Sequence, residues 1–285
     1  MMQSQSDIKE KICMITGANS GIGKATAKEL AKKGFKIVMV CRDRIRGEIA
    51  RNEIIEDSGN NHVDLMIADL ASLNSVRNCV LEFDRKYENL HILINNAGTF
   101  NYKRKITSDG YESTFAVDYL AHFLLTNLLL VKIKKSAPAR IINVSSNIHK
   151  YFKINFEDLM SEKKYVSQKA YSNAKFALVL FTYELAAQLK DMRVTVNALH
   201  PGHAKTQMTE PTKKIWRFFL KLLSPMYRTP ENAAQTSIYL ASSPELENIT
   251  GKYFKDCKEV KSHKLTYDKA LQKTLWDMSI EFVKL

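Results

Sequence analysis

Tyr171 and Lys175 stand four residues apart in the stretch AYSNAKFALVL (170–180), at the head of an otherwise apolar segment. Residues at this spacing lie on one face of a helix, so the phenol and the ammonium would be neighbours. A free tyrosine has a pKa of about 10, and a nearby positive charge favours its phenolate. The pair could therefore be a catalytic acid with its helper. The same spacing recurs at Tyr165 and Lys169, so spacing alone does not exclude a boundary tyrosine beside a solvated lysine.

A glycine-rich turn follows the first apolar run of the chain. Gly17, Gly21 and Gly23 lie between a predicted strand and a predicted helix, in TGANSGIG (16–23). Glycines in this context allow positive φ and let the backbone approach a pyrophosphate, which the helix N-terminus then stabilises. An ordinary tight turn would not call for three glycines. The turn predicts a dinucleotide site formed by six residues: Gly17, Asn19, Ser20, Gly21, Ile22 and Gly23.

The end of the second apolar run bears on the choice of cofactor. It reads VMVCRDR (38–44), with Cys41 at the place of an acidic residue and Arg42 after it. An acidic residue there would hydrogen-bond the ribose 2′-hydroxyl of NAD, whereas arginine accommodates the 2′-phosphate of NADP. We therefore expect NADP(H), with NAD(H) as the alternative. Asp43 is near enough to support that alternative, and Arg42 could be a solvated surface charge.

Two further strand ends carry polar or small residues. IADL (67–70) would bring Asp69 and Leu70 to the adenine. NNAG (95–98) ends the fourth run with residues that allow a cofactor close approach, namely Asn96, Ala97 and Gly98. Asn and Gly often only mark turns. Because the two tetrapeptides lie at successive strand ends, together they are stronger evidence for a cofactor site than either is alone.

Apolar runs alternate with helical patterns along most of the chain. Six runs predict strands, at 11–16, 35–41, 62–68, 90–95, 139–145 and 193–199, and helical patterns include 23–33, 75–87 and 114–133. Strands that are apolar throughout, each followed by a helix, indicate a parallel sheet covered on both faces. We expect one α/β domain over residues 1–285, with a Rossmann-type doubly wound sheet. The alternation of strand and helix patterns is interrupted at about 203–228. We interpret this segment as a helical substrate lid after the sixth strand.

Composition narrows the classes of partner. The net charge of +13 favours anionic partners, but the lysines are scattered and do not form one basic helix, which argues against nucleic acid. The four cysteines lie far apart without metal-ligand or redox spacing, so we expect no metal site and a reducing compartment. The start of the chain is polar, and no run reaches the roughly 18 uninterrupted apolar residues of a membrane span. We expect neither a signal peptide nor a transmembrane anchor.

Several motifs together resemble the short-chain dehydrogenase/reductase family. They occur in the family's order over essentially the whole chain: TGANSGIG, NNAG, NVSS (143–146), YSNAK (171–175) and HPG (200–202). The phrases HFLLTNLLL (122–130) and TPENAAQTSIYLA (229–241) look like its retinol dehydrogenase-like branch. The resemblance implies hydride transfer between a nicotinamide cofactor and an alcohol/carbonyl pair.

The resemblance also assigns roles at the expected active site. Tyr171 would exchange the substrate proton, and Lys175 and the oxidised nicotinamide would together lower the pKa of its phenol. Lys175 would also hold the nicotinamide ribose. Ser146, 25 residues before Tyr171, would orient the substrate oxygen, leaving Ser145 a structural role. The later segment LHPGHAKT (199–206) resembles the one that lies along the nicotinamide. There Pro201 and Gly202 shape a turn, and Thr206 would contact the carboxamide, cap a helix, or do both.

Asp118 departs from the family pattern, which generally has asparagine at this position in FAVDYLAHF (115–123). That asparagine ordinarily holds a water in the proton relay behind the lysine. An ionised aspartate accepts hydrogen bonds but cannot donate them, and it could instead pair with Lys175. Either the relay tolerates aspartate, or turnover is slowed, or the chain is a nucleotide-binding or sensing protein that does not turn over substrate.

We expect a cytoplasmic NADP(H)-dependent enzyme that interconverts a lipophilic alcohol and its aldehyde or ketone. The apolar lid favours a retinoid, steroid, terpenoid or fatty-chain substrate over a sugar. The basic, aromatic segment 212–228 could contact a membrane surface peripherally, and a lid or a dimer contact would explain it equally well. Family resemblance suggests a homodimer.

Overall fold

Eight strands form one sheet in the order β3-β2-β1-β4-β5-β6-β7-β8. The computed structural model describes residues 11–202 and 228–285. The strands are β1 (Ile12–Thr16), β2 (Lys36–Cys41), β3 (Val63–Ile67), β4 (Ile92–Asn95), β5 (Ala139–Val144), β6 (Val194–His200), β7 (Tyr253–Lys255) and β8 (Lys258–Glu259). All pairs up to β7 are parallel. The strand order reverses between β1 and β4, which is where such sheets bind ligands.

The six predicted strands are confirmed to within two residues at each end. The sequence patterns missed the last two strands, because β7 and β8 have only three and two residues. Asp256 and Cys257, at φ 54° and 58°, form the tight turn between them. Since β8 runs antiparallel to β7, the sheet is mostly rather than wholly parallel, as an edge hairpin allows.

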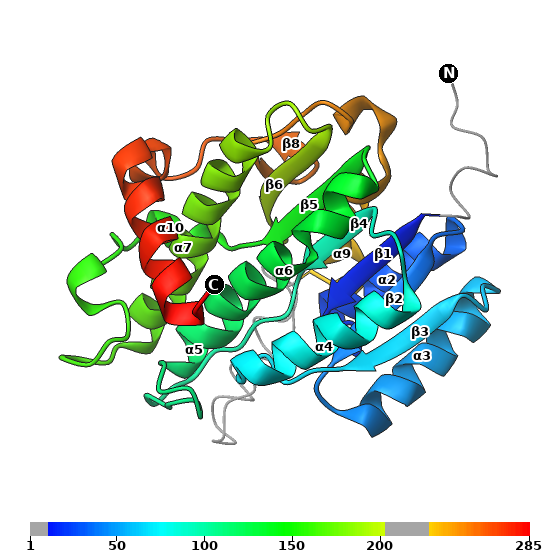
Figure 1. Cartoon of the computed structure of the whole chain (residues 1–285), viewed down its shortest axis with the longest axis horizontal. Helices are drawn as coiled ribbons and strands as arrows, with labels where there is room; N and C mark the ends of the chain where they lie inside the picture. The colour runs from blue at the N-terminus through cyan, green and yellow to red at the C-terminus, as the bar shows by residue number, and fades with distance from the viewer. Residues whose placement is uncertain (1–10, 203–227) are drawn as a thin grey trace.

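Helices cover both faces of the sheet (Figure 1). The longer ones are α2 (Gly21–Lys32), α3 (Arg44–Ser58), α4 (Leu73–Lys86), α6 (Ala121–Lys135), α7 (Ser167–Gln188), α9 (Pro230–Ser242) and α10 (Lys269–Val283). One core cluster lies under α4, α6 and α7, and the other lies under α2, α3 and α9. The C-terminal α10 packs on the outer side of α7, where Trp276 stacks on Phe181. The architecture is a single doubly wound α/β domain.

The helical stretch Ser113–Lys135 is long and apolar enough to cross a membrane. It consists of the short α5 (Ser113–Phe115), a π-helical turn at Ala116–Leu120 and α6. However, 72% of its apolar window is buried inside the protein, as expected for the core helix of an α/β domain.

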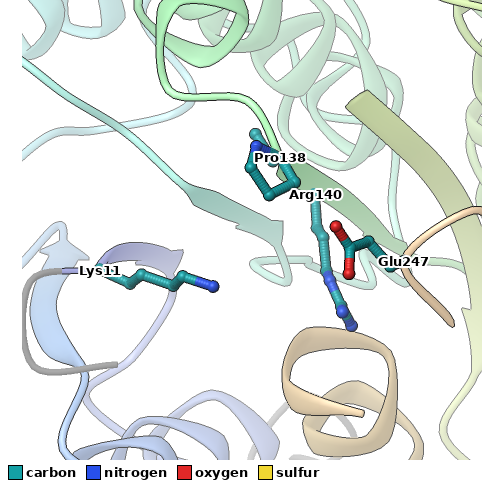
Figure 2. A pocket seen from close by; sticks show the side chains of 5 residues that line it. Lys11, Pro138, Arg140 and Glu247 are labelled. Atoms are coloured by element: carbon teal, nitrogen blue, oxygen red, sulfur yellow. The ribbon is translucent and has the colours of Figure 1, made fainter. Parts of the chain in front are cut away.

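A small hollow lies at the amino ends of the strands (Figure 2). Its lining includes Lys11, Pro138, Arg140 and Glu247, and its volume of about 20 Å³ is room for about one water molecule. This end of the sheet is opposite the glycine turn and the NNAG segment, so the hollow is not the predicted cofactor site.

Several predictions fall on residues outside the described ranges. They are Thr206 and all but the last residue of both the predicted lid at 203–228 and the possible membrane contact at 212–228. They therefore remain predictions from the sequence.

Candidate active site

Tyr171 and Lys175 both lie on the first turns of α7, as their spacing predicted. The Lys175 ammonium lies 5.5 Å from the centre of the Tyr171 ring. It also donates a hydrogen bond to the carbonyl of Val144 at the end of β5 (3.1 Å). The lysine side chain is only 3% exposed. The strand end and the helix thus fix a buried cation beside a half-buried phenol.

Asp118 faces the same cation from the π-helical turn. One carboxylate oxygen, Oδ2, lies 3.2 Å from Lys175 Nζ, and both side chains are buried. The other, Oδ1, accepts a hydrogen bond from the backbone N–H of Thr99 (2.6 Å). A Cβ added to Gly98 would lie 3.0 Å from Oδ2, so a glycine lets the NNAG segment pass close to this ion pair. The pairing that the sequence offered as one alternative is present.

The ion pair sets the balance of charge at the phenol. Burial disfavours the charge of Lys175, but Asp118 and Tyr171 outweigh it, so the pKa of the lysine is raised. Burial raises the pKa of Tyr171; Lys175 opposes this, Asp118 adds to it, and a hydrogen bond from Ser146 favours the phenolate. Lys175 thus acts on the tyrosine in the expected direction, but in the protein alone the pKa of Tyr171 is raised, because desolvation and the aspartate exceed the help from the lysine.

The two serines after β5 have different surroundings. Ser145 is buried and donates a hydrogen bond to the backbone carbonyl of Lys175 (2.8 Å), which ties the strand to α7. Ser146 is half-buried, and its hydroxyl is within hydrogen-bond reach of Tyr171. The predicted division between a structural Ser145 and a Ser146 beside the tyrosine agrees with these contacts. Tyr165 instead donates to the carbonyl of Asn101 (2.7 Å), in the segment after β4.

Thr16 is a site residue that sequence reasoning missed. Its hydroxyl accepts hydrogen bonds from the backbone N–H groups of Asn96 and Ala97, each at 2.9 Å, while its carbonyl accepts from the side chain of Asn96 (2.8 Å). It also lies 3.0 Å from Nε2 of the buried His122. Thr16 therefore joins the ends of β1 and β4 at the switch point. The partners lie about 80 residues away in the chain, so no local pattern signals them.

The glycine turn has the geometry that a pyrophosphate requires. Gly17 and Gly21 have φ of 68° and 54°, in the left-handed region. A Cβ on Gly23 would lie 2.4 Å from the carbonyl oxygen of Gly17, so only glycine lets the helix start this close to the strand. Ser20 caps α2 without a side-chain hydrogen bond, and the first turn of the helix holds no acidic residue. The N–H groups there are available to an anion, which fits a dinucleotide phosphate.

A Gly23→Ala substitution should weaken NADPH binding at least about tenfold, because the new methyl group would push the turn away from the helix N-terminus. Isothermal titration of the purified variant measures this. Gly59→Ala is the matched control: that glycine also has positive φ, 66°, but an added Cβ meets nothing within 4 Å. Equal affinities for the parent and Gly23→Ala would show that the turn does not hold the cofactor.

The residues that follow β2 bear on the choice between NADP(H) and NAD(H). Asp43 caps α3, and its side chain accepts a hydrogen bond from the N–H of Arg46 (2.9 Å). Arg42 is exposed and makes no hydrogen bond or ion pair with any residue in the described part of the chain. Cys41 is buried, and its pKa is raised to about 12, so it carries no charge. Two charged residues lie between β2 and α3. Asp43 caps the helix, whereas Arg42 has no partner in the described part of the chain.

The other predicted contacts lie along the same edge of the sheet. Asp69 accepts a hydrogen bond from the N–H of Ala71 (3.0 Å), in the turn after β3, and Leu70 next to it is buried. Pro201 and Gly202 follow β6, where Gly202 has φ 91° and packs against the side chain of Arg228. The strand ends thus bring every predicted contact in the described ranges to one edge.

Comparison with known proteins agrees with this geometry. Residues 11–215 match the family model for short chain dehydrogenases. Mouse retinol dehydrogenase 14 is 45% identical over 282 residues, which cover 94% of this chain and 84% of that protein.

Solved structures share the fold. An uncharacterised protein from Mycobacterium paratuberculosis has a TM-score of 0.78 at 29% identity, covering 99% of this chain and 97% of its own. A blue fluorescent protein from a metagenomic library, in complex with NADPH, has a TM-score of 0.69 at 25% identity, covering 86% of this chain and 95% of its own. Together with the motifs and the site, these matches show that the chain belongs to the short-chain dehydrogenase family of oxidoreductases, in its retinol dehydrogenase-like branch.

Proposed function

We propose that the protein is an NADP(H)-dependent oxidoreductase that interconverts a lipophilic alcohol and its aldehyde or ketone. The observation that carries the proposal is the Tyr171–Lys175 pair at the carboxyl edge of the sheet, next to a glycine turn that fits a dinucleotide. The 45% identity to a retinol dehydrogenase supports a retinoid or similar apolar substrate over a sugar.

The roles of the residues follow from their charges. A bound nicotinamide supplies or accepts the hydride. In reduction, Tyr171 gives its phenolic proton to the substrate oxygen; in oxidation, the phenolate takes the alcohol's proton. Lys175 favours the phenolate, because its ammonium lies 5.5 Å from the centre of the Tyr171 ring. The Ser146 hydroxyl donates to the substrate oxygen and stabilises its developing charge.

Arg42 supports NADP(H) as the cofactor, because it is exposed and unpaired among the described residues while Asp43 is occupied as a helix cap. The parent should prefer NADPH to NADH in kcat/KM, and Arg42→Ala should reduce this preference at least about tenfold, since a charge-assisted phosphate contact contributes roughly 1.5–3 kcal/mol. Arg85→Ala, which removes an exposed arginine of α4, is the control. A parent that uses NADH as well as NADPH would refute the assignment.

The substrate is tested with the purified protein and four carbonyl compounds: retinal, a ketosteroid, a terpenoid aldehyde and decanal. NADPH oxidation is followed at 340 nm and the alcohol product is identified by chromatography. The proposal expects turnover of at least one apolar carbonyl and none of a sugar aldehyde. Tight NADPH binding without turnover in either direction, over a widened set of substrates, would contradict it.

The ion pair of Asp118 with Lys175 favours a second candidate, a nucleotide-binding protein without turnover. The carboxylate holds the cation that would otherwise favour the phenolate, and burial raises the pKa of Tyr171 further. Restored turnover in Asp118→Asn, from a parent that binds NADPH but has no activity, would support this candidate.

The proposal places the enzyme in the cytoplasm, as a homodimer that could contact a membrane peripherally through 212–228. Family resemblance supports the dimer, and the basic, apolar composition of that segment supports the membrane contact. Light scattering and co-sedimentation with anionic vesicles test the two separately.

A further inference from the structure

Three aromatic rings form a row that begins at the reactive tyrosine. The Phe100 ring stands edge-on to Tyr171, with centroids 5.6 Å apart and ring planes at 74°. The Tyr102 ring stands edge-on to Phe100, at 5.2 Å and 82°. Edge-to-face pairs at these separations are a favoured aromatic geometry. Tyr171 and Phe100 are half-buried, whereas Tyr102 is 60% exposed, so the row leads from the active site to the protein surface.

The backbone beside Phe100 is anchored on both sides. Thr99 donates its N–H to Asp118, at 2.6 Å. Asn101 accepts a hydrogen bond from the Tyr165 hydroxyl (2.7 Å) and donates to the hydroxyl of Thr114 (3.3 Å). These contacts join the segment after β4 to the π-helical region and to the loop before α7. The row is therefore a fixed part of the active-site wall.

The chemistry of the row selects the ligand that it can hold. Its rings offer apolar surface, and its only polar group beyond Tyr171 is the hydroxyl of Tyr102 at the outer end. Tyr102 is 60% exposed at the outer end of the row, so its ring continues the apolar surface of Phe100 and is accessible to a ligand that reaches Tyr171. A sugar would find few hydrogen-bond partners along these rings. A hydrocarbon chain would bind there favourably, because the rings would cover its apolar surface and remove it from water.

We propose that Phe100 and Tyr102 bind the hydrocarbon chain of the substrate and thereby set a preference for long chains. The reacting carbon lies at Tyr171, the first carbons of the chain contact Phe100, and the more distant ones contact Tyr102. This inference rests on the proposed function and adds to it the residues that select the substrate.

The test is a series of straight-chain aldehydes from butanal to decanal with NADPH. For the parent, kcat/KM should rise along the series, by up to about fourfold for each methylene that the wall buries. In Phe100→Ala, the ratio of kcat/KM for decanal to that for butanal should fall about tenfold. In Tyr102→Ser the loss should be confined to octanal and decanal, because only these reach the outer ring. Tyr102→Phe keeps the ring and should keep the ratio.

Leu81→Ala is the control, since it removes a 55% exposed apolar side chain from α4, away from the row. A ratio that falls as much in this control as in Phe100→Ala, or an unchanged ratio in Phe100→Ala, would overturn the inference. The proposed function would survive that second result, because the parent would still reduce the aldehydes.

Binding of retinal separates the two proposals in the other direction. In the Tyr171→Phe protein, retinal is titrated by quenching of protein fluorescence, with and without Phe100→Ala. We expect the added substitution to raise Kd about tenfold. This result with a parent that reduces no aldehyde would support the aromatic wall and contradict the proposed reaction. Equal Kd values would contradict the wall.

Discussion

Tyr171→Phe should abolish turnover while leaving NADPH binding nearly unchanged. The substitution removes the hydroxyl to which we assign the exchange of the substrate proton, and general acid–base catalysis is worth about 10²–10⁴ in rate. The ring itself is kept, so its edge-to-face contact with Phe100 persists. Steady-state kinetics with retinal measure the loss, and titration calorimetry measures the cofactor affinity.

Tyr111→Phe is the matched control for this prediction. The hydroxyl of Tyr111 donates a hydrogen bond to the backbone carbonyl of Phe282 (2.6 Å) and makes no contact with the aromatic row. Its loss should change kcat by no more than about threefold, the scale of one neutral hydrogen bond at the lower end. A Tyr171→Phe protein that keeps a tenth of the parent's rate would refute the role of the phenol.

Asp118→Asn should shift the pH profile of alcohol oxidation towards lower pH. The aspartate raises the pKa of Tyr171 directly and also stabilises the charge of Lys175. Without that negative charge the phenolate forms more readily. If the profile shifts by about one pH unit, the rate should increase about tenfold at pH values below the pKa of the tyrosine. The profile of kcat/KM against pH measures the shift. Asp277→Asn makes the same chemical change at an exposed site on α10 and should shift nothing.

Asp118 also makes the stability of the protein depend on pH. Burial raises the pKa of Asp118 from 3.8 to about 6, against the charge of Lys175 and the hydrogen bond from Thr99. Because the folded pKa is the higher one, the folded state binds the proton more tightly. The contribution of Asp118 to stability is therefore present below the unfolded value of 3.8 and is lost as pH rises through about 6.

Urea denaturation of the parent and Asp118→Asn at several pH values measures this difference. The stability of the parent relative to the variant should fall as pH rises from about 4 to about 6. Profiles and stabilities that stay parallel at every pH would show that the ion pair has no influence on the phenol or on folding.

The sequence was sufficient to predict those features that a local pattern encodes. The glycine turn, the apolar strands and the Tyr171–Lys175 spacing each occupy one short stretch, and each lies where the pattern indicated. The strands β7 and β8 were missed because three and two residues are too few for a periodicity. Thr16 was missed because its partners come from another strand.

Charge balance in the site was also beyond local patterns. The sequence showed that Lys175 would favour the phenolate, and it does so. It could not show how deeply the group would be buried or that Asp118 would reach within 3.2 Å of the lysine. Burial and Asp118 together raise the pKa of Tyr171 in spite of the lysine. The extent of burial depends on the packing of the whole domain, which no short stretch of sequence encodes.

Transfer of deuterium from NADPH to retinal tests the central claim most directly. The protein is incubated with retinal and with NADPH that carries deuterium at both C4 positions of the nicotinamide, and the product is analysed by mass spectrometry. The account predicts retinol with one deuterium on the carbinol carbon, and none of this product from Tyr171→Phe. Retinol without deuterium, or labelled retinol in equal amount from the Tyr171→Phe variant, would contradict it.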